Sequence, residues 1–145
     1  MRLVVQRVLE ARVSVDNACV GKIDHGLMIL VGITHDDTES QVKFLAQKVA
    51  NLRIFSDLDD KMNLSVLDVA GSVLAVSQFT LYADIVKGNR PSYVAAARPN
   101  VAQPLYKLFI NELSLLGVTV ASGIFGADMQ VSLINDGPVT IIMDK

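Results

Sequence analysis

Two polar segments stand out because each interrupts an apolar run that is typical of a β-strand. The first, Ser77-Gln78-Phe79-Thr80, follows the apolar residues 73–76. A strand end of this kind can aim Gln and Thr side chains and free backbone N–H groups into a cleft, where they bind a developing oxyanion. A strand that simply emerges into solvent would show the same residues, because Thr is common in strands, and composition favours that simpler explanation.

The second segment is Asn135-Asp136-Gly137-Pro138. An Asp-Gly pair between two β-like runs is typical of a hairpin turn that needs no function. Pro138 is unusual in that position because it directly precedes a strand-like run and cannot donate to a sheet hydrogen bond. X-Pro bonds are also the main place where cis peptides occur. The segment therefore predicts either an ordinary hairpin or a rigid unit that presents carbonyl oxygens in a fixed direction.

Two further segments combine glycine with an aromatic residue. Residues 87–93, Lys-Gly-Asn-Arg-Pro-Ser-Tyr, contain turn formers, two cations and Tyr93, which suits a loop near phosphate or an RNA end. A solvated loop explains the same composition equally well. Residues 122–127 place Phe125 between two glycines, where its ring can form a pocket wall or fold back onto the core.

The common catalytic and metal-binding patterns are absent. The chain has no glycine-rich phosphate loop, no Gly-x-Ser-x-Gly nucleophile elbow and no His-Glu-x-x-His pair. Its two histidines, His25 and His35, lie in predicted turns, so a Ser-His-Asp triad is not expected. The acidic cluster at residues 57–60 lacks the glycine and final glutamate of a calcium loop, and we interpret it as solvated surface.

Composition predicts one domain over residues 1–145, because 51% hydrophobic and 19% charged residues can form a continuous core. The net charge of −2 argues against wide contact with nucleic acid, although a narrow contact with one RNA end stays open. A single cysteine, Cys19, and the lack of an export signal fit a reducing cytoplasm. No run is long enough to span a bilayer. The high apolar fraction favours an oligomer.

The expected elements are strands at both ends of the chain and two helices between them. Helical spacing predicts helices over 39–52, with a Thr38/Gln41 capping box, and over 100–116, with Pro104 in the first turn and Gly117 as the stop. Residues 27–31 predict a central strand, and 66–69 and 73–79 two more. The order of elements is not the strict alternation of a doubly wound fold, so we expect an α+β domain with a curved, largely antiparallel sheet.

Four segments, taken together, resemble the D-aminoacyl-tRNA deacylase family, also called D-Tyr-tRNA(Tyr) deacylase. They are Val5-Gln6-Arg7-Val8, residues 77–81, residues 88–92 and residues 135–140. The match covers essentially the whole chain. It implies a barrel-like homodimer in the cytoplasm, with no metal or other cofactor and no membrane or DNA partner. The implied reaction is hydrolysis of the ester between a D-amino acid and the tRNA 3′ end, with glycine on tRNA(Ala) as a further substrate.

The resemblance also assigns roles to the first polar segment. Ser77 is expected to line the pocket, while Gln78, the Phe79 N–H and Thr80 position the substrate and support an oxyanion. By the resemblance, Thr80 is the candidate nucleophile on one view of the mechanism, while another view gives catalysis to the 2′-hydroxyl of the RNA. The sequence slightly favours the RNA hydroxyl, because Thr80 has no adjacent His or carboxylate base, whereas the ribose hydroxyl lies beside the ester.

By resemblance, Gly137 and Pro138 form a cis unit that enters the pocket of the partner subunit and excludes L side chains. Ala102, Phe125 and Met129 are expected to line the pocket or pack against the terminal adenosine. Two alternatives stay open at this point. One is a non-catalytic RNA-end or nucleotide-binding module that uses Lys87, Arg90 and Phe125, with Gly137-Pro138 as an ordinary hairpin. The other is an unrelated small-ester hydrolase.

Overall fold

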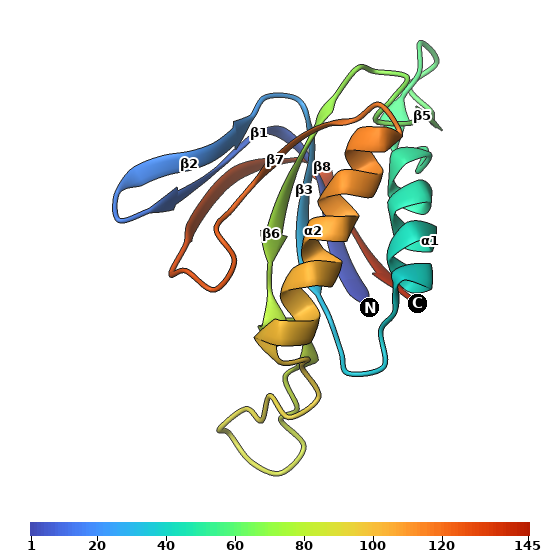
Figure 1. Cartoon of the computed structure of the whole chain (residues 1–145). Helices are drawn as coiled ribbons and strands as arrows, with labels where there is room; N and C mark the ends of the chain where they lie inside the picture. The colour runs from blue at the N-terminus through green and yellow to red at the C-terminus, as the bar shows by residue number, and fades with distance from the viewer.

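One long strand organises the sheet in the computed structural model, which describes residues 1–145 (Figure 1). Strand β1 (Arg2–Val15) pairs antiparallel with β8 (Gln130–Asp144) on one side. On the other side it pairs antiparallel with β3 (Gly26–Gly32) and then with β2 (Ala18–Ile23). A turn at Asp16 and Asn17, both with positive φ, joins β1 to β2, as their turn chemistry predicts.

The remaining strands of the sheet run parallel, and each parallel connection contains a helix. Strand β3 pairs with β6 (Ser72–Ser77), and β6 pairs with β7 (Thr119–Ser122). Helix α1 (Glu39–Ala50) lies between β3 and β6 in the chain, and α2 (Pro99–Leu115) lies between β6 and β7. Since three of the five pairings are antiparallel, the prediction of a largely antiparallel sheet is confirmed.

The sheet curls until β2 approaches β7, which gives the barrel-like α+β fold that the sequence predicts. Gly21 allows this approach, because a Cβ there would lie 2.8 Å from the Ser122 carbonyl oxygen. Helices α1 and α2 cover one face of the sheet, and the opposite face lines the interior of the curled part (Figure 1). None of the helices is both long and apolar enough to cross a membrane.

Both helices are found close to their predicted positions. Helix α1 begins after Thr38 with the predicted capping box, and it ends at Ala50 instead of residue 52. Helix α2 begins at Pro99, so the prediction that Pro104 lies in the first turn is wrong. Pro104 lies inside the helix, where its missing N–H leaves the carbonyl of exposed Asn100 to water. Gly117, with φ +93, follows the helix as the predicted stop.

Two predictions between the helices need correction. Residues 66–69 form a turn and not a strand, because Asp68 accepts hydrogen bonds from the Ser65 N–H and hydroxyl at 2.8 and 2.7 Å. The small hairpin of β4 (Phe55–Ser56) and β5 (Met62–Leu64) precedes this turn. Strand β6 also ends earlier than predicted, at Ser77, and the chain then forms a 3-10 helix, η1 (Phe79–Tyr82).

The predicted turn at residues 135–138 is a bulge within one strand. Thr140 pairs with Gln6 and Asn135 pairs with Val8, so both halves of β8 contact the same strand and no hairpin forms. Gly137 has φ +113, and the Gly137-Pro138 peptide is cis. Because both flanking segments are paired with β1, the bulge projects from a fixed base.

Candidate active site

A pocket of about 620 Å³ lies at the carboxyl ends of β3 and β6. Its walls come from η1, the loop before α2, the start of α2 and the loop between β7 and β8. Twelve of its 18 lining residues are hydrophobic, as in most sites that bind small organic groups. Six of the residues singled out in the sequence line it together: Ser77, Gln78, Phe79, Ala102, Phe125 and Met129.

The polar wall of the pocket follows from the way β6 ends. The Gln78 N–H donates to the Val31 carbonyl at 2.8 Å, which holds this residue beside β3. The first turn of η1 is then closed by Leu81 N–H, which donates to the Gln78 carbonyl at 3.3 Å. The N–H groups of Phe79 and Thr80 precede that bond, so they have no acceptor within the helix. Such donors can bind a carbonyl oxygen as negative charge develops on it.

Thr80 is held by its neighbour and not by a base. Unlike its three predecessors in the motif, Thr80 is not one of the residues that line the pocket, and the Gln78 side-chain amide donates to its hydroxyl oxygen. An amide does not accept a proton at neutral pH. No histidine or carboxylate forms a hydrogen bond with Thr80, since exposed His35 contacts the Val94 carbonyl and exposed His25 packs on Phe55. The chain therefore offers Thr80 position but no activation as a nucleophile.

Aromatic rings form two walls of the pocket. Phe125 packs at 5.9 Å from Tyr106, whose buried hydroxyl donates to the Ala75 carbonyl at 2.8 Å. Burial raises the pKa of Tyr106 to about 12, so this hydroxyl stays a proton donor at neutral pH. On the other side, Phe79 and Tyr93 meet edge to face at 5.0 Å. Flat apolar rings at a pocket mouth suit an unpaired base.

Sequence reasoning missed two charged residues of the pocket, Arg98 and Asp128. Both are exposed and carry opposite charges. Arg98 directly precedes Pro99, the first residue of α2, and this helix-start position is the signal that could have placed it. Asp128 has no comparable signal, because a single acid in a loop fits any surface. No three His, Cys, Asp or Glu side chains gather to hold a metal ion.

Gly137 and Pro138 are not part of this pocket. They lie in the bulge of β8 beside Arg7, which pairs with Leu27 at the amino end of β3. The pocket begins at Val31, at the carboxyl end of the same strand. Four residues of strand separate these levels, roughly 13 Å along the strand. Within one chain, the two motifs therefore lie towards opposite ends of the sheet.

Arg7 and Asn135 stabilise the base of the bulge. Arg7 is only 8% exposed, and its Nη1 donates to the Ile54 carbonyl at 2.6 Å. Its Nε lies 2.8 Å from the Asp136 carboxylate, close enough for an ion pair but without hydrogen-bond alignment. The Asn135 amide donates to the carbonyls of Arg7 and Val139 at 2.9 and 3.0 Å. These contacts fix the base from which exposed Gly137 and Pro138 project.

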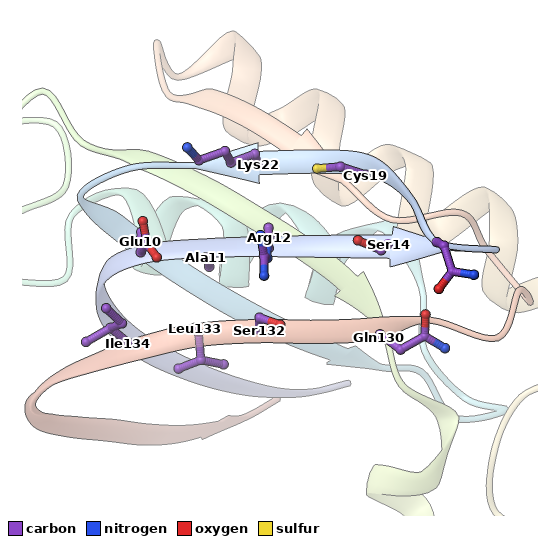
Figure 2. A pocket seen from close by; sticks show the side chains of 11 residues that line it. Glu10, Ala11, Arg12, Ser14, Cys19, Lys22, Gln130, Ser132, Leu133 and Ile134 are labelled. Carbon is purple, nitrogen blue, oxygen red and sulfur yellow. The ribbon is translucent and has the colours of Figure 1, made fainter.

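A second depression, about 760 Å³ in volume, lies on the outer face of β1, β2 and β8. Figure 2 shows Glu10, Arg12 and Ser14 along β1, with Lys22 and Ser132 on the flanking strands. Arg12 pairs with both Lys22 and Ser132, so these side chains share one face because they occupy alternating strand positions. The depression contains none of the predicted site residues, and we interpret it as the polar outer face of the sheet.

Comparisons with known proteins agree with the fold and with the motifs. The family model described as D-Tyr-tRNA(Tyr) deacylase matches residues 4–144. A D-aminoacyl-tRNA deacylase of Brevibacillus brevis is 60% identical, with all of both chains covered. One of Akkermansia muciniphila is 63% identical, with 100% of this chain and 97% of the relative covered.

Two solved structures share the architecture. The c-Myc DNA Unwinding Element Binding Protein superposes with a TM-score of 0.93 at 38% identity, covering 100% of this chain and 99% of that one. A probable eukaryotic D-amino acid tRNA deacylase superposes with a TM-score of 0.88 at 18% identity, covering 99% and 98%, and shows the fold alone. The sequence matches set aside both a non-catalytic RNA-end module and an unrelated ester hydrolase. The chain belongs to the D-Tyr-tRNA(Tyr) deacylase family and is a hydrolase that acts on aminoacyl-tRNA.

Proposed function

We propose that the chain hydrolyses the ester of D-aminoacyl-tRNA, and of glycine mischarged on tRNA(Ala), to release the amino acid and tRNA. The observation that carries this proposal is the pocket itself. It combines the donors at the start of η1 with an aromatic wall that includes Phe125. An aminoacyl ester on a terminal adenosine needs both features. As a tRNA-editing enzyme, the protein would work in the cytoplasm.

The proposed chemistry uses the RNA as part of the catalyst. The Phe79 N–H would stabilise the oxyanion of the tetrahedral intermediate, and Gln78, held through its bond to Thr80, would position the ester. The 2′-hydroxyl of the terminal ribose would assist the attack, because it already lies beside the scissile bond. The lack of a base bonded to Thr80 supports this assignment over a Thr80 nucleophile.

A homodimer would complete each site. Gly137 and Pro138 are exposed and far from the pocket of their own chain, whereas a two-fold axis can bring opposite ends of two sheets together. Exposed apolar side chains on β1 and β8 offer surface for such a contact; they are Leu9, Ile134 and Ile142, at 52%, 50% and 66% exposure. In this arrangement the Gly-Pro unit of one subunit would enter the pocket of the other.

Chirality would then be selected by exclusion. Rigid carbonyl oxygens of Gly137 and Pro138 would hold the α-ammonium group of the substrate and leave no volume for an L side chain. The wrong substrate is rejected by a clash, and the right one needs no additional contacts. Glycine has no side chain to clash, so it would be hydrolysed as well.

The direct test compares D-Tyr-tRNA with L-Tyr-tRNA under the same conditions. We expect release of D-tyrosine while the L ester stays intact. Equal loss of both esters, or of neither, would contradict the proposed function.

The contribution of the partner subunit is tested by mixing two inactive variants. Gln78→Ala impairs the pocket, and Gly137→Ala impairs the bulge. If Gly137 acts in trans, a mixed dimer contains one intact site, and random mixing restores roughly a quarter of the wild-type activity. No recovery after confirmed subunit exchange would place the complete site within one chain.

The role of the RNA hydroxyl is tested with a 2′-deoxy terminal adenosine that carries D-tyrosine at the 3′ position. A severe loss of single-turnover rate is expected. Undiminished turnover would remove the 2′-hydroxyl from the mechanism.

A further inference from the structure

The loop of residues 83–98 has a charge opposite to that of the whole chain. It contains Lys87, Arg90 and Arg98 but only one acid, Asp84, so its net charge is +2. Because the chain as a whole carries −2, the other residues together carry −4. Cations gathered in one segment of an acidic protein are typical of a local contact with polyanions.

These three cations are unpaired. None of them forms an ion pair or a side-chain hydrogen bond, whereas Arg2, Arg7, Lys22 and Lys43 each lie within 4.0 Å of a carboxylate. The one acid of the loop forms no ion pair with them; the Asp84 carboxylate accepts the Val86 N–H at 2.9 Å. The positive charge of the loop is therefore available to a ligand.

The loop is built as a projecting arm on a fixed base. Asp84 and Ser92 exchange two backbone hydrogen bonds of 2.8 Å, which close residues 84–92 into an arm. The base is tied to the loop after β3, since the Thr34 hydroxyl donates to the Ala95 carbonyl at 2.6 Å. At the tip, Gly88 has φ +125 and nothing lies within 4 Å of its missing Cβ. Figure 1 shows the arm extending beyond the end of the sheet and α2.

The arm is continuous with the pocket. It begins soon after η1 and ends at Arg98, and Tyr93 and Arg98 both line the pocket. The arm therefore forms one rim of the pocket, and we place the exit of the RNA across this rim because the arm carries the unpaired cations next to the pocket. The phosphates next to the ester would pass the rim, and those further along the strand would meet the tip.

We propose that Lys87 and Arg90 bind backbone phosphates of the tRNA acceptor stem, away from the esterified adenosine. This inference rests on the proposed function. It separates two tasks on one side of the molecule: the pocket binds the amino acid and terminal adenosine, and the arm binds RNA without reading its sequence.

The test compares two substrates, D-Tyr-tRNA and the 3′ ester of D-tyrosine with adenosine, which has no phosphate. In Lys87→Ala/Arg90→Ala, the KM for D-Tyr-tRNA should rise about tenfold near 0.15 M salt, while hydrolysis of the adenosine ester stays unchanged. The slope of log affinity against log salt should fall by about 1.5 to 2, as expected for the loss of two phosphate contacts.

Two control variants isolate charge at this site. Lys48→Ala/Lys61→Ala removes two other exposed cations that form no ion pair, at the end of the molecule that carries the β4–β5 hairpin, and it should behave as wild type. Lys87→Arg/Arg90→Lys keeps the charge and should retain affinity for tRNA. An equal loss on both substrates, an unchanged KM for tRNA, or an altered oligomeric state in the alanine variant would overturn the proposal.

Equilibrium binding of uncharged tRNA separates this proposal from the proposed function. If the wild-type chain hydrolyses neither ester, the proposed function fails. The proposed phosphate contacts of the arm can still be tested in that case. Lys87→Ala/Arg90→Ala should weaken binding of uncharged tRNA and lower the slope of log affinity against log salt by the same amount. Unchanged binding of uncharged tRNA would refute the proposed phosphate contacts of the arm, whatever the catalytic result.

Discussion

The two ends of strand β3 carry structures of opposite kinds. At its carboxyl end, several segments enclose a largely apolar pocket whose polar wall lies at the end of β6 and the start of η1. At its amino end, a single bulge of β8 exposes Gly137 and Pro138 and rests on buried Arg7. In the proposed homodimer, the bulge of one subunit would supply the group that tests chirality to the pocket of the other.

The largest effect is expected from Gly137→Ala. A Cβ there would lie 2.8 Å from a Val139 methyl carbon and 3.0 Å from Arg7 Nη2, at φ +113. The bulge must shift, and a displacement of about 1 Å in a positioning group costs on the order of 100-fold in rate. We expect such a loss of kcat/KM on D-Tyr-tRNA. A variant with wild-type kinetics would show that the bulge plays no part in the reaction.

Arg7→Met should disturb the bulge indirectly, by removing the side chain that supports it. It removes the partner of Asp136 and the donor to the Ile54 carbonyl, so we expect a loss of about 2 to 3 kcal/mol in unfolding free energy. If the bulge selects chirality, the ratio of D-ester to L-ester hydrolysis falls as well. Arg7→Lys keeps the charge but cannot serve both partners, so it should recover only part of the ratio. Loss of stability with an unchanged ratio would give Arg7 a purely structural role.

The contrast also explains what the sequence could predict. Helix α1 was predictable because the Thr38 capping box and the 3.6-residue spacing are local signals. The bulge was not, because Asp136-Gly137 has the local chemistry of a hairpin. Only the pairing of both flanking segments with β1 excludes that turn. The prediction of a strand at residues 66–69 was wrong for a similar reason, since the hydrogen bonds of Ser65 and Asp68 outweigh the β-propensity of two valines.

The residues of the candidate site also divide into those with a local sequence signal and those placed only by the tertiary structure. The motif residues Gln78, Phe79 and Phe125 were named from resemblance, and the fold gathers them in one pocket. Arg98 and Asp128 were missed, because their place depends on how the segments before α2 and β8 meet in space. No pattern in a single sequence predicts that these two segments pack together.

At the pocket end, Thr80→Ala should have a modest effect. Thr80 accepts a hydrogen bond from Gln78 and has no base, so we expect a decrease of less than about tenfold in single-turnover rate. Loss of a true nucleophile costs about 10⁴-fold or more. Thr80→Ser is the matched control, because it keeps the hydroxyl, and it should lie close to wild type. A decrease of the larger size in Thr80→Ala alone would make the pocket end self-sufficient in catalysis.

The smallest effect concerns the support beneath the pocket wall. Burial raises the pKa of both Tyr106 and Tyr82 to about 12, above the ordinary value near 10 that applies when the chain is unfolded. Above pH 10 the unfolded chain therefore releases protons that the folded chain keeps. The unfolding free energy should stay level with respect to these groups below about pH 9 and fall between about pH 10 and 12.

Tyr106→Phe should flatten part of that decline. At neutral pH the change should cost only about 1 kcal/mol, because the Ala75 carbonyl keeps its bond from the Gly123 N–H at 3.0 Å. Denaturant unfolding at a series of pH values, beside an ultraviolet titration of tyrosinate, measures both quantities. If the double variant Tyr82→Phe/Tyr106→Phe loses stability over pH 10 to 12 as steeply as wild type, the decline belongs to other groups.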